Sequence, residues 1–139
     1  MSANADLETD ELLARLPGPI PDDREGALRA ALASAMVSVM KAYYGRGPTA
    51  AKAWLLDDYV FVVLEGGLTR NEETLLADGK HDIVRGYRLA FQDTVSQTMT
   101  AIVAKLVGRN VLTYHSQIVF DPPRAFEIFV LEPRSPSAP

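Results

Sequence analysis

The sequence contains no cysteine among its 139 residues. Disulfide bonds, thiolate metal sites and a cysteine nucleophile are therefore excluded, and the lack of disulfides agrees with a cytoplasmic location. The first residues have neither a basic segment nor an apolar core, so they do not resemble a secretory signal. Because no apolar run reaches the ~18 residues that a membrane span needs, we expect no direct membrane insertion.

Positive charge is also scarce. The formal net charge is −4, and residues 1–23 hold six acidic residues against one arginine, a net charge of −5. The remaining residues sum to +1 and contain no dense stripe of Lys and Arg, so nucleic-acid binding has little electrostatic support. The sequence lacks a Ser-His-Asp order, an HExxH motif and a Walker motif. We therefore predict no catalytic residue, no metal and no other cofactor.

The hydrophobic content of 47% is that of a globular chain, and the length suits one domain. Apolar residues three or four apart predict two long helices and one short one: these cover residues 24–44, 69–77 and 82–107. Apolar runs bounded by turn residues predict two hairpins: residues 49–56 with 59–65, and 109–120 with 125–132. One or two helical turns are expected between Asp6 and Leu16.

The order of these elements indicates an internal repeat. Each long helix ends in Gly-Arg, at Gly45 and Gly108, and each hairpin closes with Val-Leu-Glu. We predict an α+β fold in which two helix–β-hairpin units form a four-stranded antiparallel sheet, with the long helices packed on one face. The strand order stays open. The run 59–64 has no polar face, which is typical of a central strand covered on both sides.

Local chemistry sets two helix boundaries. Gly45 suits the left-handed position that follows a helix, and the segment Gly47-Pro48-Thr49 prevents the helix from resuming. Thr69 and Glu72 have the spacing of a capping box, in which each side chain accepts from the other residue's backbone amide. These positions, together with Gly108, are predicted to be structural.

The same block carries a family resemblance. Its residues are Tyr44-Gly45-Arg46-Gly47-Pro48-Thr49, Val62-Val63-Leu64-Glu65-Gly66-Gly67-Leu68-Thr69 and Glu72. The chain resembles the MpsC family, a bacterial domain first catalogued without a known function. The resemblance implies a small cytoplasmic bacterial protein associated with membrane-potential-generating and inorganic-carbon-uptake systems. It implies no catalytic residues.

The resemblance covers nearly the whole body of the chain. We expect a single MpsC-like α+β domain over residues 24–132, an acidic, proline-containing tail over residues 1–23, and a disordered tail over residues 133–139. The leading functional hypothesis is a non-enzymatic accessory or regulatory protein that acts through protein contacts and a small anion. One alternative is a small enzyme with a pocket around His115, Tyr114 and Glu65. Another is a purely structural homo-oligomer.

The Gly-rich turn before the short helix is a candidate anion-binding site. Two glycines before a helix N-terminus offer backbone amides to an anion, and arginines nearby would add charge; the candidates are Arg46, Gly66, Gly67, Thr69 and Arg70. The alternative is that the glycines only end a strand and that Thr69 only caps the helix. One layer of helices would leave part of the apolar strand and of the Ala-rich first helix uncovered, so we also expect a homodimer, formed through the first helix or through the sheet. The family association makes a membrane protein a candidate partner.

Overall fold

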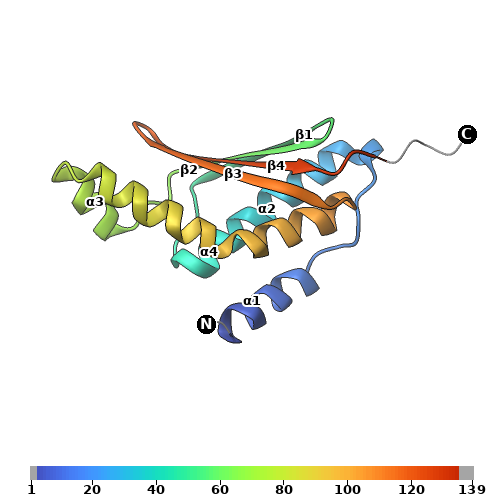
Figure 1. Cartoon of the computed structure of the whole chain (residues 1–139), viewed down its shortest axis with the longest axis horizontal. Helices are drawn as coiled ribbons and strands as arrows, with labels where there is room; N and C mark the ends of the chain where they lie inside the picture. The colour runs from blue at the N-terminus through green and yellow to red at the C-terminus, as the bar shows by residue number, and fades with distance from the viewer. Residues whose placement is uncertain (1–2, 135–139) are drawn as a thin grey trace, which may run out of the picture.

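The computed structural model describes residues 3–134 and, among their side chains, all but those of residues 3–8 and 22. A four-stranded antiparallel sheet lies over a layer of helices (Figure 1). The helices are α1 (Ala3–Ala14), the 3₁₀ helix η1 (Asp22–Arg24), α2 (Glu25–Tyr44), α3 (Arg70–Ala77) and α4 (His81–Val107). The strands are β1 (Ala50–Leu56), β2 (Tyr59–Glu65), β3 (Val111–Phe120) and β4 (Pro123–Leu131). The predicted α+β class and sheet are confirmed.

The sheet has the strand order β1-β2-β4-β3, which the sequence had left open. The two strands of each hairpin pair with each other, β1 with β2 and β3 with β4. The two units meet where β2 pairs antiparallel with β4, from Tyr59 opposite Val130 to Glu65 opposite Arg124. The corresponding strands of the two units therefore occupy equivalent places on either side of the sheet centre. The repeated order of helix and hairpin thus gives a symmetric arrangement of strands.

The predicted ends of both long helices are confirmed. Gly45 has φ +78° and its N–H donates to the Lys41 carbonyl at 3.0 Å. Gly108 has φ +73° and its N–H donates to the Ala104 carbonyl at 2.9 Å. An L side chain disfavours this backbone conformation, so glycine suits both positions.

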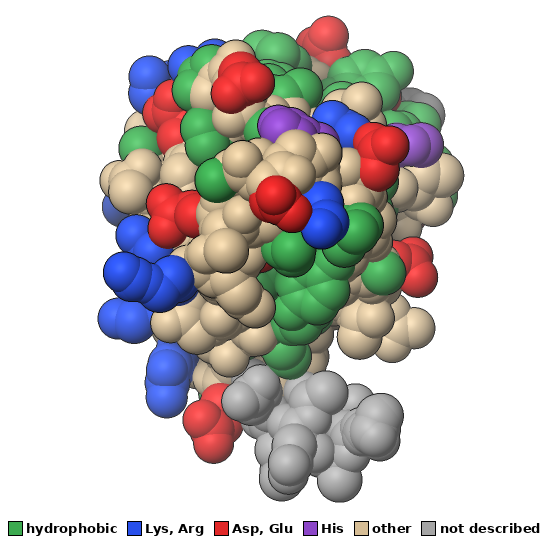
Figure 2. Space-filling model, turned by 90° about the vertical axis from the view of Figure 1, so that its left-hand side faces the viewer, with side chains coloured by type: hydrophobic (Ala, Val, Ile, Leu, Met, Phe, Trp, Pro, Cys, Tyr) green, Lys and Arg blue, Asp and Glu red, His purple; other side chains and the backbone are tan. Residues whose placement is uncertain are grey.

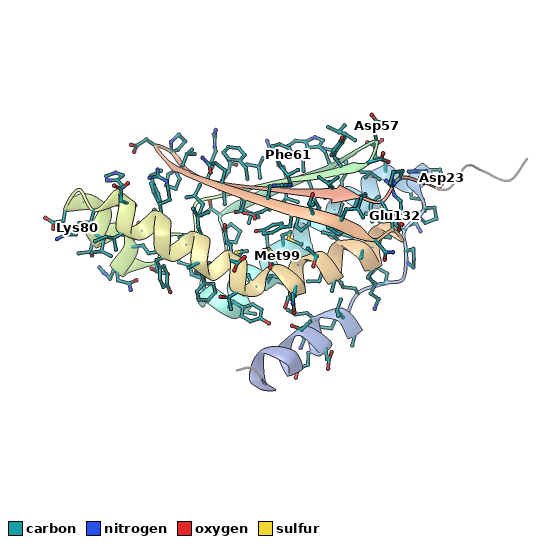
Figure 3. The ribbon with its side chains drawn as sticks, in the orientation of Figure 1. Asp23, Asp57, Phe61, Lys80, Met99 and Glu132 are labelled. Carbon is teal, nitrogen blue, oxygen red and sulfur yellow. The ribbon has the colours of Figure 1, made fainter. Side chains whose placement is uncertain are left out.

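The core lies between the long helices and the inner face of the sheet. Met99 of α4 lies beneath the strands (Figure 3) and is fully buried. The largest fully buried side chains include Leu28, Leu32, Met36, Met99, Ile102, Leu106, Phe129 and Leu131. Burying one such side chain contributes about 1.5–3 kcal/mol, so the paired helix stripes hold the two units together.

Helix α1 lies beneath the other helices, on the side away from the sheet (Figure 1). Lys105 donates to the Leu13 carbonyl at 2.5 Å, and the Ile20 amide donates to the Leu106 carbonyl at 2.9 Å. The helix has 12 residues, longer than the one or two turns expected from sequence. Of the predicted C-terminal tail, residues 135–139 lie outside the described residues.

One expectation about β2 is wrong. The apolar run was expected to be covered on both sides, but its residues alternate between buried and partly exposed. Val60, Val62 and Leu64 face the helices. Phe61 lies on the opposite, upper face of the sheet (Figure 3). The reason is that the helices form one layer and cover only one face of the sheet.

Candidate functional site

The two halves of the Gly-rich block lie against each other. The Thr49 amide and hydroxyl both donate to the Glu65 carbonyl, at 2.8 and 3.0 Å. Gly66 and Gly67 both have positive φ, and a Cβ on Gly67 would lie 3.0 Å from the Pro48 Cα. The loop can approach so closely only because these positions are glycine. The structure therefore places the two sequence segments in one site.

A buried ion pair joins this loop to the helices. The capping box of α3 is formed as predicted, with the Thr69 amide donating to Glu72 Oε1 at 2.9 Å. Arg88 of α4 donates to both Glu72 carboxylate oxygens, at 2.6 and 2.7 Å, and to the Gly67 carbonyl at 2.9 Å. Glu72 and Arg88 are only 2% and 7% exposed. One carboxylate thus caps α3 and fixes Arg88 beneath the Gly67 carbonyl.

The charges in this pair are stabilised by each other. Burial alone would raise the pKa of Glu72, but hydrogen bonds from Arg88 and Thr69 outweigh it and lower that pKa. Burial likewise opposes the charge on Arg88, and Glu72 raises its pKa. The Arg88 guanidinium lies 4.4 Å from the centroid of the Tyr44 ring, and this ring stacks on Phe91 with centroids 4.3 Å apart. Aromatic faces attract such a cation, so Tyr44 adds to the pairing.

A second buried polar cluster lies beside the first and was not predicted. Glu127 of β4 is fully buried, and Tyr114 of β3 donates to its carboxylate. The single hydroxyl hydrogen of Ser116 on β3 has two acceptors within reach, Gln92 Oε1 of α4 and the second Glu127 oxygen at 3.2 Å. Burial raises the pKa of Glu127 to about 7, although the hydrogen bonds from Tyr114 and Ser116 act in the opposite direction. A carboxyl group with this pKa changes charge near neutral pH.

A small cavity opens between the Gly66–Leu68 loop and α4, with a volume of about 20 Å³. Of the predicted anion-binding residues, Arg46, Gly66 and Gly67 line it. Thr69 is not in the lining, and its hydroxyl and amide belong to the capping box. Arg70 is exposed at the start of α3 and also lies outside the lining. Sequence reasoning missed the other polar residues that line the cavity: Arg88, Gln92 and Arg124.

The residues of the enzyme hypothesis are not brought together. His115 is exposed on β3 and lies 3.1 Å from the Thr113 hydroxyl. Tyr114 points to the other face of the sheet, where it bonds to Glu127. Glu65 pairs with Arg124 at 3.3 Å. The structure therefore gives no pocket that these three side chains share.

The uncovered face of the sheet is largely apolar. Its central row, read across β1, β2, β4 and β3, is Trp54, Phe61, Ile128 and His115. Phe61 stacks on Trp54 at 5.7 Å and on Phe126 at 6.2 Å between ring centroids. At the β1–β2 turn, Leu56 and Tyr59 are 58% and 51% exposed. Contiguous apolar surface of this kind is a candidate interaction site.

Other exposed hydrophobic side chains lie at one end of the molecule. Figure 2 views the end that carries α3, with a hydrophobic patch near its middle and basic side chains along one side. Ile83 and Tyr87, in the first turns of α4, are 57% and 53% exposed. They lie on a helix and not on the sheet, so they provide control positions for tests of the sheet face.

These features define a class of protein: an α+β fold with a helix-covered sheet, a buried ion pair beside a Gly-rich loop, and one open apolar face. Residues 24–133 match the MpsC family model, which is described as a Na⁺-translocating membrane potential-generating system. The protein belongs to the MpsC family, so the resemblance found in the sequence is confirmed. No curated protein and no solved structure matches the chain.

Among residues 3–134, none of the helices combines the length and apolarity required to traverse a bilayer. Among the side chains that the structure describes, no group of three or more His, Cys, Asp or Glu residues is placed to hold a metal ion.

Proposed function

We propose that this protein is a non-enzymatic accessory or regulatory component of the membrane potential-generating system for which its family is named. Its mode of action would be protein contact, made through the uncovered face of the sheet. The family match supports the association with such a system. The apolar row across β1, β2 and β4 supports the contact surface.

The proposed occupant of this face is a second copy of the chain, in a homodimer. The face has an apolar centre and a polar margin: Lys52 and His115 lie on the edge strands, and the Glu65–Arg124 pair lies at one end. Protein interfaces commonly combine an apolar core with a polar rim. A second copy would offer the same centre and the same rim, which suits the self-complementary contact of a two-fold dimer.

The size of the face also suits a dimer. Strand spacing and rise give four strands of seven residues a flat footprint of about 450 Å². The relief of the side chains raises the accessible area above this footprint, towards the ~600 Å² per partner of the smaller stable interfaces. Two sheets packed in this way form a sandwich, a common arrangement of apolar sheet faces.

The test is sedimentation velocity on the wild type and two matched variants at tens of micromolar, a range that detects ordinary homodimers. Phe61→Glu places a charge at the centre of the face, and we expect it to produce a monomer. Ile83→Glu places the same charge on the exposed start of α4, and this variant should remain a dimer. Circular dichroism of each variant is the control for folding. A monomeric wild type would overturn the homodimer, and equal behaviour of the two variants would overturn the assignment of the dimer contact to this face of the sheet.

The accessory role is tested separately, in cells. A photo-crosslinking residue at position 61 should give a product of twice the mass of the chain, and the same residue at position 83 should not. Cells that contain only the Phe61→Glu protein should have an altered membrane potential, measured with a voltage-sensitive dye, whereas Ile83→Glu cells should match the wild type. A dimer whose loss leaves the membrane potential unchanged would favour the purely structural homo-oligomer. A crosslink to a membrane protein in place of a second copy would refute the homodimer.

A further inference from the structure

The cavity beside the Gly-rich loop contains one donor that the protein leaves unused. Gln92 is 1% exposed and lines the cavity. Its Oε1 bonds to the Ser116 hydroxyl, while its Nε2 has no hydrogen-bond partner within the described part of the chain. An unpaired buried donor costs free energy. A ligand that accepts a hydrogen bond from Gln92 would remove this cost.

The charges around the cavity have one sign. Three arginines line it, namely Arg46, Arg88 and Arg124, and no carboxylate does. Arg88 is paired with Glu72, and Arg124 with Glu65. The exposed Arg46 forms no ion pair with any residue that the structure describes. The site therefore retains one uncompensated positive charge, which favours an anion.

The shape of the site limits the size of the anion. A volume of about 20 Å³ exceeds the ~10–15 Å³ that a single water needs, so the cavity takes about one oxygen-sized atom. The rest of the ligand must lie on the open side, where Arg46 is exposed. The wall on the side of the loop is fixed, because a Cβ on Gly67 would lie only 3.0 Å from the Pro48 Cα.

We propose that this cavity binds a free small oxyanion of the carboxylate or carbonate type. One ligand oxygen accepts from Gln92 Nε2, and the negative charge faces Arg46 and Arg88. This assignment differs from binding at the N-terminus of α3, because the amide of Gln92 and the guanidinium of Arg88 come from α4. Both side chains lie four residues apart on that helix and therefore share one face.

The experiment is an NMR titration of the full chain with sodium formate, observing the side-chain NH₂ resonance of Gln92 and the amide of Gly67. We expect saturable shifts with a dissociation constant in the millimolar range, on the order of 1–10 mM for so small a ligand. Sodium bicarbonate should cause shifts of the same resonances. Sodium chloride at equal ionic strength should not.

Matched variants identify the groups that bind. Gln92→Met keeps the length of the side chain but removes the donor, and should weaken formate binding at least 10-fold. Gln97→Met, at an exposed position of the same helix, should leave the affinity unchanged. Arg46→Gln, at an exposed position, should weaken binding about 5-fold, consistent with the loss of one charge interaction.

The proposal is overturned by any of three results. The first is no saturable shift up to about 50 mM formate or bicarbonate, well above the expected dissociation constant. The second is an equal response to chloride, which would indicate general screening. The third is an unchanged formate affinity in both Gln92→Met and Arg46→Gln. Because these readouts concern ligand binding by the isolated chain, they do not depend on the dimer or on the membrane association.

Discussion

Glu127 offers the sharpest test of the buried polar cluster. Its carboxylate is fully buried between the sheet and α4, and the hydrogen bonds from Tyr114 and Ser116 do not compensate for the loss of water. Burial raises its pKa from the ordinary 4.5 to about 7. The other ionisable groups in electrostatic contact with it are Tyr114 on β3 and Tyr44 on α2. Replacing Glu127 by glutamine keeps the shape of the side chain and one acceptor oxygen, puts an NH₂ donor in place of the other oxygen, and removes the titration.

The sign of the effect follows from proton linkage. Between pH 4.5 and pH 7, the folded protein holds a proton on Glu127 that the unfolded chain has lost. The contribution of Glu127 to the free energy of unfolding is therefore fully present below pH 4.5, decreases through this window, and is lost above pH 7. The pKa difference corresponds to about 3 kcal/mol. Relative to the wild type, Glu127→Gln should thus gain up to about 3 kcal/mol in stability between pH 4 and pH 8.

Urea unfolding followed by circular dichroism, at half-unit steps from pH 4 to pH 8.5, measures this difference. Glu72 has a lowered pKa and loses its stabilising charge as the pH falls. This effect is common to both proteins and cancels in the comparison. Glu73→Gln, at an exposed position of α3, is the control and should follow the wild type. Parallel stability curves for wild type and Glu127→Gln would refute the reasoning.

Three further substitutions test the site around the Gly-rich loop and the helix ends beside it. Arg88→Met leaves the Glu72 carboxylate buried without its partner and should lower the free energy of unfolding by about 3–5 kcal/mol. In urea melts, adding Glu72→Gln to this variant should restore part of the lost stability. No recovery of stability would mean that the pair is not coupled. Thr69→Ala removes the capping hydroxyl of α3 and should lower the free energy of unfolding by about 1 kcal/mol. Gly45→Val should lower it further, because a β-branched residue disfavours φ +78°. A Gly45→Val melt that coincides with that of the wild type would contradict the left-handed cap.

Local sequence chemistry predicted the elements that depend on near neighbours. Gly45 and Thr69 fixed helix boundaries because their effect is confined to one turn, and these predictions are confirmed. Whether Arg46 reaches the Gly66-Gly67 loop does not follow from local sequence rules, and the structure shows that all three residues line one cavity. That result required the tertiary packing of two loops.

The buried polar groups show what the sequence analysis could not assign. The partner of Glu72 is Arg88, sixteen residues away on another helix, and no local rule selects that arginine. A usable signal for Glu127 did exist: it lies at every-second-residue spacing from Ala125, Phe129 and Leu131 along β4, and these three side chains face the core. A carboxylate at an inward position of an apolar strand indicates a buried charge. Its partners come from β3, so only the structure identifies them.

The fluorescence of the single tryptophan of the chain tests the central claim, that the protein acts through the uncovered face of its sheet. Trp54 lies on this face and stacks on Phe61, so its exposure reports contact there. The measurement is acrylamide quenching of Trp54 fluorescence from about 0.1 to about 50 micromolar protein, a range that spans typical homodimer dissociation constants. The account predicts that quenching decreases as the concentration rises in the wild type and in Ile83→Glu, and stays constant in Phe61→Glu. Quenching that is independent of concentration in all three proteins would contradict it.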